Sequence, residues 1–191
     1  MTLDAKAALA ELRDGNARFA SGESLHRFVG DERNASVEGQ QPFAVVVGCS
    51  DSRVPVEAVF DAGVGELFVV RTAGHVLAAA SLASIRFAVQ KLGSRLVVVL
   101  GHEDCGAVSA ALAGDAPDWL APIVEKIDVS HVDPGLAPAD ADDALLAAAV
   151  DDHVRDTVTQ LRGFLASFEP EAEVAGAAYK LASGEVHWLD D

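Results

Sequence analysis

Features that indicate secreted, membrane-bound or nucleic-acid-binding proteins are scarce in this sequence. Its 191 residues include only two cysteines, and no apolar run approaches the ~20 residues that a membrane-spanning helix needs. Lys and Arg number 14 against 30 Asp and Glu, so the formal net charge is −16. An acidic surface of this kind repels nucleic acid and anionic membranes, and we therefore expect neither as a partner.

The first residues lack the pattern of a secretory signal. Met1-Thr2-Leu3-Asp4-Ala5-Lys6 has neither a basic start nor an apolar stretch. We therefore expect a cytoplasmic protein, in a compartment that keeps thiols reduced. Under those conditions two cysteines indicate metal binding or catalysis rather than a disulfide. Cys49 and Cys105 become the first candidates for functional residues.

Hydrophobic patterning predicts an α/β fold. Three continuous β-branched runs are typical of strands buried on both faces, as in a parallel sheet, and they cover residues 43–48, 66–70 and 95–100. Apolar residues recur at helical spacing over 3–20, 78–92, 106–113 and 140–166, and the tail after residue 174 has the pattern of strand, turn and strand. We predict a mainly parallel central β-sheet flanked by helices.

The length of the chain suits one compact domain with a full core and is too short for two ordinary ones. No internal repeat, low-complexity tract or linker interrupts the sequence, although residues 21–41 are polar and show no clear periodicity. We therefore expect a single domain over residues 1–191. Within it, residues 1–40 would form an N-terminal helical arm.

Three residues that commonly bind metal fall at the ends of predicted strands. Cys49 follows the first strand, His102 follows the third, and Cys105 lies three residues after His102. Open α/β sheets bind their ligands at the carboxyl ends of the strands. One imidazole and two thiolates form a three-ligand zinc site with an open fourth position, which is typical of catalytic zinc. A structural zinc or two isolated thiols are the alternatives.

A carboxylate and a guanidinium stand close to the first of these residues. In Cys49-Ser-Asp51-Ser-Arg53, Asp51 either takes the fourth zinc position or pairs with Arg53 and leaves that position to water. A water bound there loses its proton near neutral pH. A surface salt bridge of little consequence is the remaining interpretation.

These motifs resemble the β-class carbonic anhydrases. The resemblance rests on Cys49-Ser-Asp-Ser-Arg53 and Gly101-His102-Glu-Asp-Cys105-Gly106, and it extends over residues 12–19, 68–74 and 176–186. It implies the fold of that class and the reversible hydration of carbon dioxide to bicarbonate and a proton by zinc-bound hydroxide. It also implies one Zn²⁺ per subunit and a homodimer or homotetramer.

The resemblance assigns roles to the residues around the predicted zinc. Cys49, His102 and Cys105 would be the zinc ligands. Asp51 and Arg53 would form the catalytic dyad that orients the hydroxide. Asp51 would itself become a zinc ligand when the site closes, which we expect at low pH.

The resemblance also implies a substrate site. Gln40 would hydrogen-bond the substrate, Phe68 and Ala73 would line an apolar wall, and the backbone N–H of Gly106 would contact bicarbonate. Phe68 and Ala73 are equally compatible with ordinary core positions, and Gln40 with a plain loop residue. His75 is a candidate proton carrier because imidazole titrates near neutral pH, with a structural role as the alternative.

Other functions remain open at this point. A related zinc hydrolase would act on carbon disulfide or carbonyl sulfide through a pocket of different shape. A non-catalytic bicarbonate or carbon dioxide sensor would be favoured if Asp51 or Arg53 were missing, and both are present. A zinc deaminase needs H-x-E and P-C-x-x-C motifs, which this sequence lacks.

Overall fold

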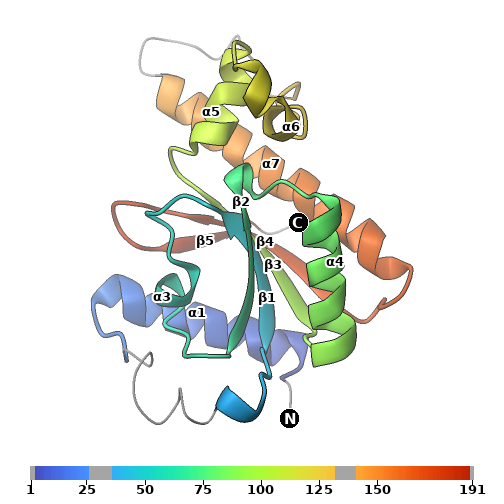
Figure 1. Ribbon diagram of the computed structural model, residues 1–191. Coiled ribbons are helices and arrows are strands. Elements are labelled where there is room, and N and C mark those ends of the chain that lie inside the picture. Colours follow the sequence, from blue (N-terminus) through green and yellow to red (C-terminus); the bar gives the residue numbers. More distant parts are fainter. Residues whose placement is uncertain (1–2, 26–35, 132–140, 190–191) are drawn as a thin grey trace.

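The computed structural model describes residues 3–25, 36–131 and 141–189 and has an α/β architecture (Figure 1). Within these residues, five strands form one sheet in the order β2-β1-β3-β4-β5. Strands β1 to β4 are parallel, and β5 is antiparallel to β4. The prediction of a mainly parallel sheet is confirmed. The strand bounds are β1 Ala44–Cys49, β2 Leu67–Thr72, β3 Leu96–His102, β4 Glu173–Tyr179 and β5 Val186–Leu189.

All four predicted helices are present, within a few residues of their expected ends. The α-helices are α1 Ala5–Ser21, α3 Val56–Val59, α4 Ala79–Phe87, α5 Gly106–Ala113, α6 Ala121–Val124 and α7 Ala141–Ala166. A π-helical turn, η3 (Ala88–Leu92), prolongs α4, and 3₁₀ turns occur at η1 Ser36–Glu38, η2 Ala73–His75 and η4 Asp118–Leu120. Much of the polar stretch expected over 21–41 lies outside the described residues. None of the described helices is long and apolar enough to cross a membrane.

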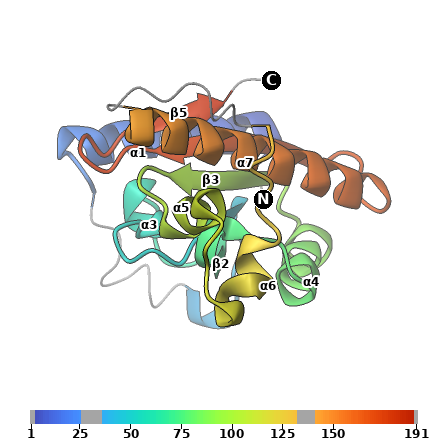
Figure 2. The same ribbon diagram turned by 90° about the horizontal axis from the view of Figure 1, so that it is seen from above.

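The sheet is covered by helices on both faces. Side chains alternate along a strand, so Val45 and Val47 face α4 and α7, while Ala44 and Val46 face α1 and α3. The long helix α7 runs beside β3 and β4 (Figure 2). Every residue of β1 and β3 is buried, which explains why these two strands are continuous apolar runs rather than alternating ones. The prediction of burial on both faces is wrong for β2, which lies at the edge of the sheet and is mostly half-buried.

The N-terminal helix is fixed to the rest of the chain by a glycine and an asparagine. A Cβ at Gly15 would lie 2.0 Å from the carbonyl oxygen of Phe60, so only glycine permits this approach of α1 to the end of α3. The buried amide of Asn16 donates to the carbonyl oxygens of Val59 at 3.1 Å and Gly184 at 2.9 Å. Gly15 and Asn16, which belong to the segment 12–19 of the family resemblance, therefore have a structural role.

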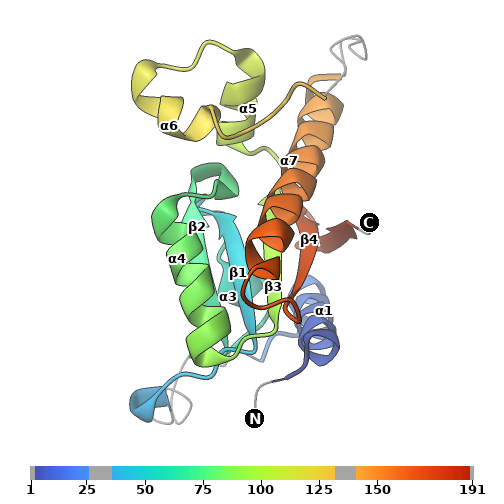
Figure 3. The same cartoon turned by 90° about the vertical axis from the view of Figure 1, so that its right-hand side faces the viewer.

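A smaller apolar cluster lies beyond the carboxyl ends of the strands. Helices α5 and α6 occupy this end of the molecule (Figures 1 and 3). The cluster contains both cysteines together with Val76, Val108 and Ile127. The two cysteines therefore lie in apolar surroundings at the edge where α/β sheets bind ligands.

Candidate metal centre

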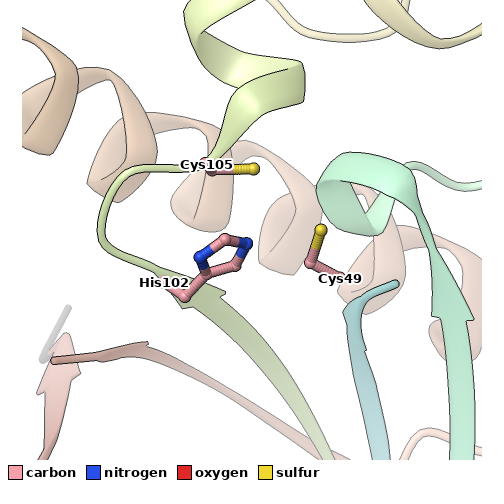
Figure 4. Close-up of side chains that lie close together, drawn as sticks. All are labelled: Cys49, His102 and Cys105. Carbon is pink, nitrogen blue, oxygen red and sulfur yellow. The ribbon is translucent and has the colours of Figure 1, made fainter. Parts of the chain in front are cut away.

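The ends of two neighbouring strands bring the predicted zinc ligands together. Cys49 is the last residue of β1 and His102 the last of β3, and these strands pair in parallel. Cys105 is the N-cap of α5. Figure 4 shows the three side chains converging, and their ligand atoms all lie within 4.8 Å of one another. Thiolate and imidazole ligands bind zinc at about 2.0 to 2.3 Å, so one ion fits among them.

The protonation of His102 fits a metal ligand. Its Nδ1 lies 2.7 Å from the carbonyl oxygen of Glu103. A carbonyl can only accept, so Nδ1 carries a proton and Nε2 is the nitrogen left for a metal ion. Among the described residues, this buried Nε2 has no hydrogen-bond partner. A buried nitrogen left unpaired is costly, and a metal ion would satisfy it.

The two thiols differ in acidity. The pKa of Cys49 falls to about 4, chiefly because Cys105 donates a hydrogen bond to its sulfur, with His102 and the N–H of Gly74 adding to the effect. Cys105 keeps its proton for Cys49, and its own burial raises its pKa further. Burial would lower the pKa of His102, but the charge of the nearby Cys49 outweighs it and raises the pKa. A metal cation would deprotonate the second thiol as well.

Asp51 and Arg53 form a bidentate ion pair beside the three ligands. Arg53 donates from Nε to Oδ1 at 3.0 Å and from Nη2 to Oδ2 at 2.8 Å. These bonds lower the pKa of Asp51 to about 2. Arg53 also donates from Nη1 to Asp104 at 2.8 Å. Asp51 lies outside the group of close ligand atoms, so this structure has the paired arrangement of the two that the sequence allowed.

Arg71 holds the segment that carries Cys49 and Asp51, a role that the sequence analysis missed. From β2 it donates to the carbonyl oxygen of Cys49 at 2.8 Å and to that of Asp51 at 2.6 Å. Its register opposite Gly48 places the guanidinium at this strand end. The sequence signal was a charged residue at the end of an otherwise apolar strand.

Known proteins share both the sequence and the fold. The family model described as "Carbonic anhydrase" matches residues 44–186. A carbonic anhydrase of Mycolicibacterium smegmatis is 43% identical over 197 residues, which cover 94% of this chain and 91% of the relative. The β-carbonic anhydrase CafA of Aspergillus fumigatus has a TM-score of 0.74 at 26% identity, covering 97% of this chain and 90% of that one. The chain belongs to the β-class carbonic anhydrases.

Two further relatives extend this finding. Carbonic anhydrase 2 of Mycobacterium tuberculosis is 48% identical over 127 residues, which cover 63% of this chain and 61% of the relative. Tetrameric β-carbonic anhydrases of Sordaria macrospora share the fold with a TM-score of 0.73 at 23% identity, covering 97% and 96% of the two chains.

Two of the four substrate residues implied by the resemblance to carbonic anhydrases lie at the metal centre. Ala73 directly follows β2 at the same sheet edge as Cys49. Gly106 is the first residue of α5, directly after Cys105. The first N–H groups of a helix have no partner within it, so the N–H of Gly106 is suited to an anion such as bicarbonate.

The other two substrate residues lie at the opposite end of the strands. Phe68 pairs with Val45, four positions before Cys49 and roughly 13 Å away along the strand. Gln40 precedes β1 and is exposed. Within one chain, therefore, the carbonic anhydrase fold does not bring Gln40 or Phe68 to the metal centre.

His75 is poorly placed to exchange protons with solvent. Its side chain is 1% exposed and stacks on His153, with ring centroids 4.3 Å apart. Among the described residues, neither of its ring nitrogens has a hydrogen-bond partner. Burial, and then the neighbouring His153, lower its pKa well below the usual value. The structure thus favours the structural role over the proton carrier.

Proposed function

We propose that this chain catalyses the reversible hydration of carbon dioxide to bicarbonate and a proton with one Zn²⁺ per subunit. The observation that carries the proposal is the convergence of Cys49, His102 and Cys105 beside the ion pair of Asp51 and Arg53. Three protein ligands leave one tetrahedral position for a reactant, unlike a structural zinc site. The carbonic anhydrase family supports the choice of substrate.

The dyad supplies orientation in this proposal. When bound, Zn²⁺ lowers the pKa of a coordinated water to about 7 and thereby provides a nucleophile at neutral pH. Asp51 would accept a hydrogen bond from that nucleophile and direct a lone pair at the carbon atom. With its pKa near 2, Asp51 stays ionised and can only accept. Arg53 holds the carboxylate at both oxygens and keeps it from the metal.

The surroundings suit a substrate that is apolar and a product that is anionic. Carbon dioxide carries no charge, so an apolar wall formed by Ala73 and the neighbouring Val76 and Ile127 is sufficient to admit it. Bicarbonate would contact the N–H of Gly106, at the positive end of the α5 dipole. The site therefore needs no basic side chain dedicated to the substrate.

The proposal includes a homodimer as the smallest complete unit. Gln40 and Phe68 lie away from the metal centre of their own chain, and a second copy would have to present them to it. A dimer of dimers would give a tetramer, the state named for the Sordaria macrospora relatives. Both ligand cysteines must stay reduced, which supports a cytoplasmic location.

Replacement of Arg53 by alanine tests the role of the dyad. Without the guanidinium, Asp51 loses its orientation and becomes free to bind the metal. We expect the stopped-flow rate of carbon dioxide hydration to fall by about 100-fold or more, with one zinc per chain retained.

Arg86→Ala is the matched control, because Arg86 contacts Gln90 and Phe168 and none of the residues of the metal centre. Its activity should equal that of the wild type. An Arg53→Ala variant with full zinc and undiminished activity would exclude the dyad from the mechanism. A zinc-loaded wild-type protein without hydration activity would refute the proposed function.

A further inference from the structure

Two hydrogen bonds connect α7 to Cys49 through a single glycine. The N–H of Gly74 donates to the sulfur of Cys49 at 3.3 Å. The carbonyl oxygen of Gly74 lies 2.8 Å from Nε2 of His153, which must carry the proton because a carbonyl only accepts. Gly74 is buried, and His153 is 2% exposed. Figure 4 shows the η2 turn, which follows β2, beside Cys49 and with α7 behind it.

The turn around Gly74 depends on contacts from outside it. Gly74 and His75 have φ angles of +61° and +44°, so two successive residues adopt the left-handed conformation. This conformation is unfavourable for a residue with a side chain. A Cβ at Gly74 would lie 2.9 Å from that of Ala107, so the turn also fits tightly against α5.

His153 supplies two of these outside contacts. It donates to Gly74, and its ring stacks on that of His75 at an interplanar angle of 26°. Sequence spacing gives no sign of this role for His153, because its partners come from a turn that lies 79 positions away. Its position on the buried face of α7 nevertheless directs its donor at the backbone next to Cys49.

We propose that His153 is a positioning residue for the metal ligand Cys49. By holding the carbonyl of Gly74, it keeps the neighbouring N–H directed at the sulfur. A hydrogen bond to a ligating thiolate reduces the charge that the sulfur donates to the metal. Hydrogen-bond partners of metal ligands thereby tune both the affinity for the metal and the pKa of a water bound to it. The inference rests on the proposed zinc site.

Cobalt substitution provides a readout that is independent of hydration activity. Co²⁺ held by thiolates has a sulfur-to-metal charge-transfer absorption whose energy falls when the sulfur loses a hydrogen bond. His153→Phe retains an aromatic ring for stacking on His75 and removes the donor. We expect the absorption of this variant to lie at longer wavelength than that of the wild type. We also expect its dissociation constant for Co²⁺ to differ from the wild-type value by about 10-fold or more.

Two further variants separate positioning from simple destabilisation. His153→Gln retains an N–H donor on a flexible side chain of similar length and should restore part of the absorption energy. Leu161→Ala removes a fully buried side chain of the same helix that packs in the core beside the sheet. It should lower the melting temperature and leave the absorption unchanged.

The possible outcomes test the role of His153 separately from the proposed zinc site. The inference is supported if the absorption shifts in His153→Phe, shifts less in His153→Gln and does not shift in Leu161→Ala. Identical spectra for the wild type and His153→Phe would overturn it, as would an equal shift in Leu161→Ala. A wild-type protein that binds Co²⁺ without any thiolate absorption would overturn the zinc site itself, and the inference with it.

Discussion

At the residue scale, the protonation of individual side chains makes this site suitable for a metal cation. Cys49 has the lower pKa of the two thiols, and His102 carries its proton on Nδ1, away from the cysteines. Asp51 remains ionised through its bonds with Arg53. The chain thus presents one thiolate, one imidazole nitrogen directed at the cysteines and an acceptor-only carboxylate, an arrangement that favours a divalent cation.

The buried pair of His75 and His153 should make the protein sensitive to acid. An unfolded histidine has a pKa of about 6.5, and burial lowers the pKa of both residues in the folded state. Below about pH 6.5 the unfolded chain takes up protons that the folded chain does not. The free energy of unfolding should then fall by up to about 1.4 kcal/mol per pH unit for each histidine, while above that pH this contribution is constant.

His75→Asn isolates this effect, because asparagine also tolerates a positive φ. Denaturant unfolding of the zinc-loaded proteins between about pH 5 and 8 should show a shallower acid slope for His75→Asn than for the wild type. His187→Asn serves as the control at an exposed position, and its slope should match that of the wild type. Equal slopes for His75→Asn and the wild type would show that His75 is not kept neutral by the fold.

At the scale of elements, the sequence predicted what depends on local pattern. Continuous apolar runs located β1, β2 and β3, although only β1 and β3 are buried at every position. Helical periodicity located α7, because burial along one face of a helix leaves that pattern. Single-turn helices such as α3 are too short for any periodicity. Motif spacing also brought the three ligands to one sheet edge, since parallel strands share their carboxyl end.

Contacts between elements that are distant in the sequence could not be predicted from local pattern. The bonds of Arg71 to the loop after β1 depend on the register of two strands, and the bond of His153 to Gly74 depends on how α7 crosses the sheet. The pairing of Asp51 with Arg53 was one of two arrangements that the sequence allowed, and local hydrogen bonds decide between them. These interactions require side-chain directions that neither periodicity nor spacing encodes.

For the whole molecule, the main consequence of the fold is that one chain does not complete the proposed site. Cys49, Ala73 and Gly106 lie at one end of the sheet, whereas Phe68 and Gln40 lie toward the other. If Gln40 hydrogen-bonds the substrate, it must do so in a second copy of this chain. Substrate binding would then require the homodimer.

Subunit mixing tests this sharing directly. Homodimers of Gln40→Ala and of Arg53→Ala should both be impaired, because every site lacks one of the two residues. In a mixed dimer, one site carries both substitutions and the other carries neither. Unfolding and refolding the two variants together should therefore restore up to about a quarter of wild-type activity, since half of the dimers at random assortment are mixed and each has one intact site.

Mixtures of each variant with itself, taken through the same refolding, provide the control. Activity of the mixture equal to the mean of the two variants would place Gln40 in the site of its own chain or outside catalysis. That outcome would leave the zinc centre intact as a proposal and would refute the shared substrate site.

Dependence of the hydration rate on bound zinc tests the account most directly. Chelated protein should be inactive, and stepwise addition of Zn²⁺ should raise the stopped-flow rate of carbon dioxide hydration in proportion, up to one equivalent per chain. The predicted result is a sharp break at that equivalence and no further rise. Hydration that persists in the chelated protein, or a fully loaded protein no faster than buffer, would contradict the assignment of Cys49, His102 and Cys105 as a catalytic zinc site.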